Sequence, residues 1–216
     1  MNGLQEKIIS NMKNLLILIS FVLTLLGCEA NKKVKNQKIP SMTNDSKPNL
    51  ETAIIGGGCF WCTEAVFERI KGVKEVISGY AGGKVLNPTY RQICTGTTGH
   101  AEVIKIIFDP KDISFKEILE LFGDAHDPTT LNRQGADEGT QYRSTIMFLN
   151  DSQQKSAMEW KSKLSEKLVD PVVTEIVKAP VFYDAEEYHQ DYYRKNPNQG
   201  YCNFVIRPKL KKLNLE

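Results

Sequence analysis

Residues 51–72 read ETAIIGGGCFWCTEAVFERIKG, and this stretch sets the architecture of the folded part of the chain. The apolar run at residues 52–55 ends at three glycines, which is typical of a short strand followed by a turn. Apolar side chains then recur at helical spacing until Gly72, so residues 60–71 are predicted to form a helix. The stretch therefore predicts a strand, a glycine turn and a helix that begins next to Cys59.

Strands and helices continue to alternate after this first unit. Strands are expected at residues 73–80, 101–108 and 144–149, helices at residues 114–122 and 152–168, and a loop-rich segment at residues 171–216. Because the two kinds of element interleave, an α/β or α+β fold is predicted over an all-α or all-β fold.

The length and charge of the chain limit what it can be. Its 216 residues, 41% of them hydrophobic, suffice for one globular domain with appendages. The formal net charge is +2, and residues 28–50 hold five lysines against two acidic residues, so the remaining domain is close to neutral. This balance argues against a dedicated nucleic-acid-binding protein, and no nucleic-acid partner is expected.

The N-terminal residues have the features of a targeting segment. Residues 15–26 read LLILISFVLTLL and follow the positive charge of Lys13. A helix of that length spans about 18 Å, which is less than the ~30 Å hydrocarbon core of a bilayer. Residues 1–27 are therefore predicted to be a signal peptide and not a membrane-spanning helix.

The sequence LLGC at residues 25–28 resembles the lipobox of bacterial lipoproteins. The resemblance implies cleavage after Gly27 and acyl chains on Cys28 that anchor the protein to a bacterial membrane, on its extracytoplasmic side. The alternative is a secreted protein in which Cys28 is an ordinary residue. Residues 28–50 hold almost no large apolar side chains and are predicted to be a flexible tether, followed by the domain at residues 51–216.

The chain has five cysteines: Cys28, Cys59, Cys62, Cys94 and Cys202. A domain of this size does not need disulfides for stability, so its thiols are candidates for reactivity. Cys59 is the strongest candidate, because free backbone N–H groups and the dipole at a helix start favour a thiolate. Cys94 is expected to be a buried, inert thiol.

Three kinds of chemistry compete for the CFWC sequence at residues 59–62. The first is a thioredoxin-like dithiol, for which CxxC alone is a weak signal. The second is zinc, since His100 and Glu102 with a CxxC are similar to the zinc-deaminase signature; here the order is reversed, and no metal is expected. The third is a single nucleophilic Cys59 beside an apolar pocket.

Motifs along the whole domain favour the third possibility. They are GCFW at 58–61, GYAGG at 79–83, NPTY at 87–90, GHAE at 99–102, HDP at 126–128, QGADEGTQYRS at 134–144 and HQDY at 189–192. In this order they resemble the A-type peptide-methionine sulfoxide reductases, which act on the S epimer. The resemblance implies a two-layer α/β sandwich around a mixed sheet with flanking helices, and no metal or organic cofactor. We expect a monomer.

The resemblance also implies a mechanism. The Cys59 thiolate attacks the sulfoxide sulfur, methionine leaves, and Cys59 becomes a sulfenic acid. Glu102 matches the acid that protonates the oxygen, which requires a pKa raised by burial. Tyr90 and Tyr142 match the phenols that hydrogen-bond this oxygen.

Substrate-binding roles follow from the same motifs. Phe60 and Trp61 match the wall around the S-methyl group, Asp137 matches a residue that binds the substrate main-chain N–H, and His189 is a weaker candidate for the same region. His100 and His126 have no comparable chemical role and are expected to be structural, and the tail tyrosines are expected to pack or to lie on the surface.

Regeneration of Cys59 is implied by the sequence GYC at residues 200–202. Cys202 matches a resolving cysteine, expected on a mobile loop, that forms a disulfide with Cys59 for a thioredoxin-like reductant to reduce. Cys62 is a competing partner, although a bridge within one helix turn would distort it. The predicted function is reduction of free and protein-bound methionine-S-sulfoxide. The alternatives are a membrane-anchored disulfide exchange protein that uses Cys59 and Cys62, or a noncatalytic lipoprotein that binds Met-rich partners.

Overall fold

The structure is a computed structural model that describes residues 49–216. The predicted signal peptide, the lipidation site Cys28 and most of the predicted tether therefore lie outside the described residues. None of the helices in the described part of the chain is both long and apolar enough to span a membrane.

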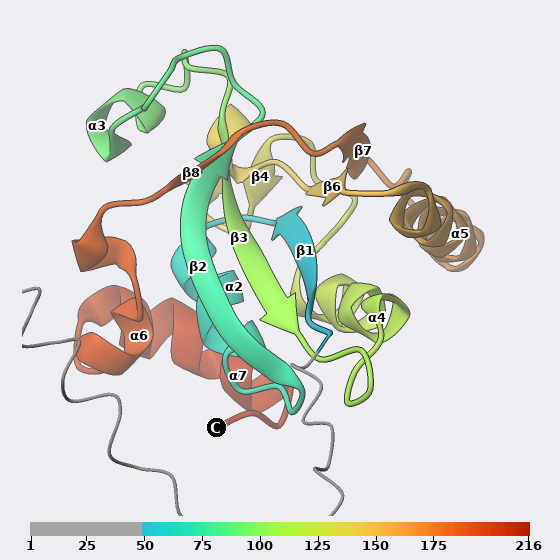
Figure 1. Cartoon of the computed structure of the whole chain (residues 1–216). Helices are drawn as coiled ribbons and strands as arrows, with labels where there is room; N and C mark the ends of the chain where they lie inside the picture. Colours follow the sequence, from blue (N-terminus) through green and yellow to red (C-terminus); the bar gives the residue numbers. More distant parts are fainter. Residues whose placement is uncertain (1–48) are drawn as a thin grey trace, which may run out of the picture. The chain divides into compact units, whose positions relative to one another are not determined.

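A six-stranded mixed sheet forms the centre of the domain (Figure 1). Its strands are β1 (Glu51–Gly56), β2 (Val73–Ala81), β3 (Ala101–Phe108), β6 (Thr145–Phe148), β7 (Glu175–Lys178) and β8 (Phe182–Asp184). They lie in the order β7-β6-β1-β3-β2-β8, and only the β6–β7 pair is parallel. A separate two-stranded ribbon pairs β4 (Arg133–Gln134) with β5 (Asp137–Glu138).

The helices follow the strands closely in sequence. They are α2 (Phe60–Phe67), α3 (Tyr90–Ile93), α4 (Phe115–Ala125), α5 (Asp151–Lys167), α6 (Tyr192–Lys195) and α7 (Arg207–Lys212), with 3₁₀ turns at Thr140–Tyr142 and Glu187–His189 and a π-helical turn at Cys202–Ile206. α4 begins at a capping box, in which Ser114 accepts from the Glu117 N–H and Glu117 accepts from the Ser114 N–H.

The main core lies between one face of the sheet and the helices. Alternate residues of β1 and β3, among them Ile55, Ile104 and Ile106, pack in one cluster with side chains of α2, α4, α5 and α7. The other face carries a smaller cluster that includes Ile54 and Val103. The domain is thus a sheet covered by helices on one face, which confirms the α/β sandwich predicted from the sequence.

Most element positions agree with the sequence pattern, and the differences have local causes. The predicted strand at residues 101–108 is β3. The predicted helix at residues 60–71 ends earlier, at Phe67, because the next N–H groups bond three residues back (Arg69 to Val66, Ile70 to Phe67) before Gly72 turns the chain at φ +96°.

The prediction that Cys202 lies on a mobile loop is wrong. Cys202 lies in a π-helical turn that runs directly into α7, and it is completely buried. Cys202, Ile206 and Leu210 are all buried in the main core, and their spacing of four residues places them on one helical face. This apolar periodicity, and not a loop, sets the local structure.

Candidate active site

Three glycines bring Cys59 to the start of α2, where it is the N-cap residue. A Cβ on Gly56 would lie 2.6 Å from the main-chain oxygen of Glu102, so only glycine allows β1 to approach β3 this closely. Gly58 has φ +89°, which favours glycine, and its N–H donates to the Tyr142 carbonyl at 3.1 Å. The turn therefore joins the helix start to the strand and loop that carry the other site residues.

Glu102 is a buried acid that faces this helix start. It is the second residue of β3, and strand alternation points it to the same face as Ile104. Its side chain accepts from the Phe60 N–H at 3.1 Å and the residue is only 2% exposed. Burial raises the pKa of Glu102 to about 8, although the Phe60 N–H opposes the shift. The carboxyl is mostly protonated at neutral pH.

Cys59 and Cys62 share a cavity of about 140 Å³ next to the β4–β5 ribbon. Burial raises the pKa of Cys59 well above its ordinary value, and the hydrogen bond to Cys62 and the charge of Glu102 raise it further. The same hydrogen bond, with Cys59 as donor, is the main reason that the pKa of Cys62 falls to about 7. Burial therefore opposes the thiolate that the position of Cys59 at a helix start favours.

Tyr201 contacts both the thiol pair and a predicted substrate-binding residue. Its hydroxyl donates to Asp137 Oδ2 at 2.8 Å and lies 3.5 Å from Cys62 Sγ. Burial raises the pKa of this phenol, which keeps it protonated as a donor. Tyr201 was not predicted to be a site residue. The only feature of the sequence that could have indicated it is its position beside Cys202 in the GYC motif.

An aromatic wall stands on the other side of the helix start. The ring of Trp61 stacks on Tyr192 with centroids 3.6 Å apart and planes 6° apart. Its Nε1–H donates to His189 Nδ1 at 3.1 Å, and the Phe60 ring lies 5.1 Å from the His189 ring. The structure thus brings Phe60, Trp61 and His189 together, and Tyr192 packs as part of the same wall.

The two predicted phenols lie at the ends of short helical turns. Tyr90 begins α3, its ring centroid lies 4.3 Å from that of His189, and its N–H donates to Glu186 at 2.8 Å. Tyr142 ends a 3₁₀ turn. Burial, followed by the charge of Glu102, raises the pKa of both hydroxyls, so both stay protonated.

A buried carboxylate holds the segment that completes the wall. Glu64, one turn after Phe60 on α2, accepts from the N–H groups of Asp191 and Tyr192 and from the Ser78 hydroxyl, each at 3.0 Å. Burial raises the pKa of Glu64 to about 7. Nothing in the sequence marks Glu64 as a site residue, because its two backbone donors lie more than 120 residues away in the tail and only the fold brings them near.

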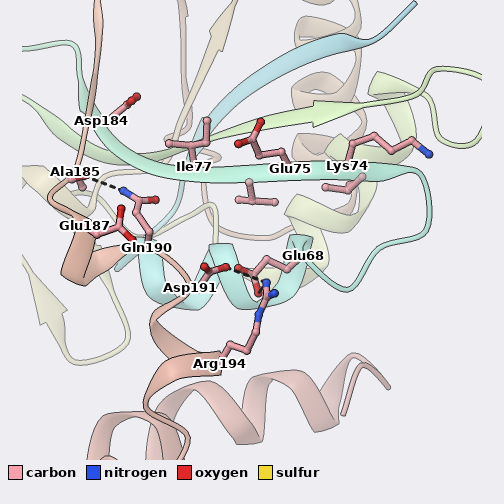
Figure 2. A pocket seen from close by; sticks show the side chains of 12 residues that line it. Glu68, Lys74, Glu75, Ile77, Asp184, Ala185, Glu187, Gln190, Asp191 and Arg194 are labelled. Atoms are coloured by element: carbon pink, nitrogen blue, oxygen red, sulfur yellow. Dashed lines mark hydrogen bonds and ion pairs between the residues drawn. The ribbon is translucent and has the colours of Figure 1, made fainter. Parts of the chain in front are cut away.

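The far side of this tail segment borders a charged cavity of about 470 Å³ (Figure 2). There Arg194 bridges Glu68 at 3.1 Å and Asp191 at 2.9 Å, and the Gln190 amide donates to Ala185 O at 2.9 Å. None of the lining residues is a cysteine or one of the predicted site residues, so this cavity is separate from the thiol pair.

The remaining cysteines and histidines differ in how they match expectation. Cys94 is exposed and not buried as expected, because it follows α3 at the protein surface. His100 bonds to backbone groups of Gly83 and Val85. His126 bonds to the Phe122 carbonyl and to the Ser144 hydroxyl, which fits a structural residue. Within residues 49–216 no three metal-ligating side chains gather closely enough to hold an ion.

These residues together define a class of protein. A cysteine at a helix start, a buried acid that is protonated at neutral pH and an aromatic wall characterise a cysteine-dependent enzyme. The family model of peptide methionine sulfoxide reductase matches residues 51–216. The chain belongs to the peptide methionine sulfoxide reductase family, which confirms the family and the enzymatic nature predicted from the sequence.

Relatives and solved structures agree with this membership. The chain is 56% identical over 169 residues to peptide methionine sulfoxide reductase MsrA 1 of Rhodopirellula baltica, which covers 78% of this chain and 88% of the relative. It is 56% identical over 163 residues to MsrA of Sulfolobus acidocaldarius, with 76% and 93% covered. Among solved structures it is similar to methionine sulfoxide reductase A of Corynebacterium diphtheriae (39% identity, TM-score 0.66, 71% and 78% covered) and to reduced Mxr1 of Saccharomyces cerevisiae (35%, TM-score 0.68, 71% and 89% covered).

Proposed function

We propose that this enzyme reduces methionine-S-sulfoxide to methionine, in proteins and as the free amino acid, with thiols as the source of electrons. The observation that carries the proposal is the placement of Cys59 next to Glu102. The Glu102 side chain accepts a hydrogen bond from the N–H of Phe60, the residue after Cys59. A soft nucleophile and a neutral acid at one point are the two groups that deoxygenation of a sulfoxide requires.

The chemical step consumes one thiol per sulfoxide. The sulfur of Cys59 attacks the substrate sulfur as an anion, while Glu102 gives its proton to the sulfoxide oxygen. The attack forms a bond between the two sulfurs. The oxygen then breaks from the substrate sulfur and bonds to Cys59 as a hydroxyl, while the sulfur–sulfur bond breaks with its electron pair going to the methionine sulfur. Methionine departs, and Cys59 is left as a sulfenic acid. Protonation of Glu102 also favours the Cys59 anion, because a charged Glu102 raises the Cys59 pKa.

The surrounding side chains bind the substrate in this proposal. Tyr90 and Tyr142 donate to the sulfoxide oxygen as charge develops on it. Phe60 and Trp61 form the wall for the S-methyl group, and His189 fixes Trp61 through its hydrogen bond. Asp137, which Tyr201 orients, accepts the main-chain N–H of the substrate.

Replacing Tyr142 with Phe is expected to lower kcat about 10²-fold, since one donor to the developing oxyanion is lost. Steady-state assays with dithiothreitol measure this effect. Tyr183→Phe is the matched control, because Tyr183 on β8 packs against His100 and not against the thiol pair. Equal losses in both variants would contradict the proposed role.

The assay that tests the function compares the two epimers of methionine sulfoxide with dithiothreitol as reductant. The proposal requires consumption of the S epimer with little loss of the R epimer. A disulfide exchange protein would instead reduce an added protein disulfide without consuming sulfoxide, and a binding protein would do neither.

Two thiols can resolve the sulfenic acid, and we propose that they act in turn. Cys62 lines the same cavity as Cys59. A disulfide between two residues of one helix turn would distort the helix, but Cys59 is the N-cap residue and lies just outside the helical conformation. Attack by Cys62 gives a Cys59–Cys62 disulfide and releases water. Cys202, whose pKa is raised by burial and then by the charge of Cys62, attacks the Cys62 sulfur and releases the Cys59 thiol. A thioredoxin-like donor then reduces the resulting Cys62–Cys202 disulfide.

Cys202→Ser is expected to release one equivalent of methionine per enzyme and then to stall with a thioredoxin system. Its oxidised form is expected to carry the Cys59–Cys62 bond, whereas Cys62→Ser is expected to slow disulfide formation. Peptide mapping after one turnover without reductant identifies the bonded pair in each variant. A direct Cys59–Cys202 bond formed in Cys62→Ser at the wild-type rate would remove Cys62 from the sequence of steps.

We further propose that the enzyme is attached to a membrane by a lipid. The LLGC sequence at residues 25–28 supports a lipid on Cys28 and attachment to the extracytoplasmic side of a bacterial membrane. The mass of the intact protein extracted from membranes tests the acylation. We also propose that the enzyme acts as a monomer, which sedimentation measures.

A further inference from the structure

We propose that the groove between the C-terminal ends of α4 and α5 and the start of α7 binds the polypeptide on one side of the oxidised methionine. Extended protein segments that carry a large apolar residue near the methionine sulfoxide are then the preferred substrates. This inference rests on the proposed function and names the substrate class of the same site.

The groove is continuous with the cavity that contains Cys59. The cavity beside Cys59 is bounded on one side by Gln134 and Lys209. The same two side chains also line the groove, which has a volume of about 870 Å³. Asp137, the proposed acceptor for the substrate main-chain N–H, also lines this cavity, so a bound chain that continues past Gln134 and Lys209 enters the groove.

The sizes of the two spaces suit different parts of a substrate. Sites that enclose whole small molecules have volumes of roughly 300–1,000 Å³. The cavity at Cys59, at about 140 Å³, is smaller than this range and fits a single side chain. The groove is about six times larger, so free methionine sulfoxide leaves it empty and an extended peptide fills it.

Apolar side chains form one part of the groove wall, beside charged ones. Trp160 and Leu164 of α5 line it. The loop after α5 adds Leu168, 38% exposed, and Val169, 101% exposed. Exposed apolar side chains beside a hollow are a common feature of binding surfaces. The charged residues around the groove include both signs, four acidic residues (Glu120, Asp124, Asp127, Asp170) and three lysines (Lys167, Lys209, Lys212), so charge alone selects no strongly acidic or basic partner.

The test compares two substrates that share the same reacting group. One is N-acetyl-methionine-S-sulfoxide amide, and the other is a peptide of about nine residues with central methionine-S-sulfoxide and leucine on both sides. Val169→Asp and Leu168→Asp place a charge in the apolar part of the groove. Val181→Asp is the matched control, since Val181 is 65% exposed and lies outside the groove.

The expected result is a fall of about tenfold in kcat/KM for the long peptide in both groove variants, since a lost apolar contact of a leucine side chain has this effect. The small amide is expected to react at the wild-type rate in all variants, and Val181→Asp to be unchanged with both substrates. Dithiothreitol is the reductant, so binding of a protein reductant does not enter.

Other outcomes separate the possible failures. No sulfoxide consumption by the wild-type enzyme with either substrate would overturn the proposed function itself. Unchanged long-peptide kinetics in the groove variants would overturn the groove alone. A defect that appears only with thioredoxin as reductant would assign the groove to the reductant, and a change in sedimentation would assign it to a second copy of the chain.

Discussion

Replacing Cys59 with Ala is expected to abolish methionine formation from methionine-S-sulfoxide, with a loss of at least about 10⁴-fold, as for other enzymes that lose their nucleophile. Cys62 is the more acidic thiol of the pair, but it lies one turn inside α2 and bonds to Tyr201. The Cys59→Ala variant therefore shows whether the position of a thiol or its acidity decides which cysteine is the nucleophile. Quantification of methionine after a single turnover gives the result without dependence on the reductant.

Cys94→Ala is the control for this experiment, because Cys94 is exposed and follows α3. Full activity is expected in this variant. If Cys59→Ala still reduced the S epimer selectively, Cys62 would be the nucleophile, and the low pKa of its thiol would then be the property that matters.

The parts of the site that depend on local pattern were predictable from the sequence. The apolar run of residues 101–108 predicts β3, whereas the buried position of Glu102 was expected only from the resemblance to the family, since a glutamate at a strand start is ordinarily solvated. The glycine run before Cys59 likewise indicates a tight turn into a helix. Both the strand and the turn are indicated by a pattern of fewer than about ten consecutive residues, so contacts with distant segments are not needed to predict them.

The parts that depend on contacts between distant segments were not predictable in this way. Glu64 receives its backbone donors from Asp191 and Tyr192, and nothing near Glu64 in the sequence indicates them. The proton on Cys59 depends on how deeply both thiols are buried, which sequence position does not give. The helical turn at Cys202 has a local signal in the sequence, the four-residue apolar spacing from Cys202 to Ile206 and Leu210.

The second large effect is expected at Glu102. Glu102→Gln keeps the size of the side chain and an oxygen that can accept from the Phe60 N–H, but it cannot release a proton to the sulfoxide oxygen. Loss of a general acid costs typically 10²–10⁴-fold, and we expect kcat to fall by about 10³-fold. Glu75→Gln, an exposed carboxyl on β2, is the control and is expected to retain full activity.

The pH dependence distinguishes a lost acid from a disturbed site. Because the pKa of Glu102 is raised to about 8, its proton is available below that pH and is lost above it. The wild-type rate is therefore expected to fall as pH rises through about 8, and in Glu102→Gln this descending limb is expected to disappear. A limb that persists unchanged in the variant would assign the titration to another group and remove Glu102 as the acid.

The same shift in pKa gives a thermodynamic test that needs no substrate. The folded state holds a proton on Glu102 between about pH 4.5 and 8, where the unfolded chain has released it. The free energy of unfolding contributed by this group therefore falls as pH rises across that window, by at most about 1.4 kcal/mol per pH unit. Glu102→Gln is expected to reduce the slope of this part of the stability profile in urea denaturation, and to remove it between about pH 7 and 8, while Glu75→Gln leaves the profile as it is. Below about pH 7 a slope remains, because burial also raises the pKa of Glu64, to about 7. A buried acid that needs its proton for catalysis thus makes the enzyme less stable as the pH rises toward the point where that proton is lost.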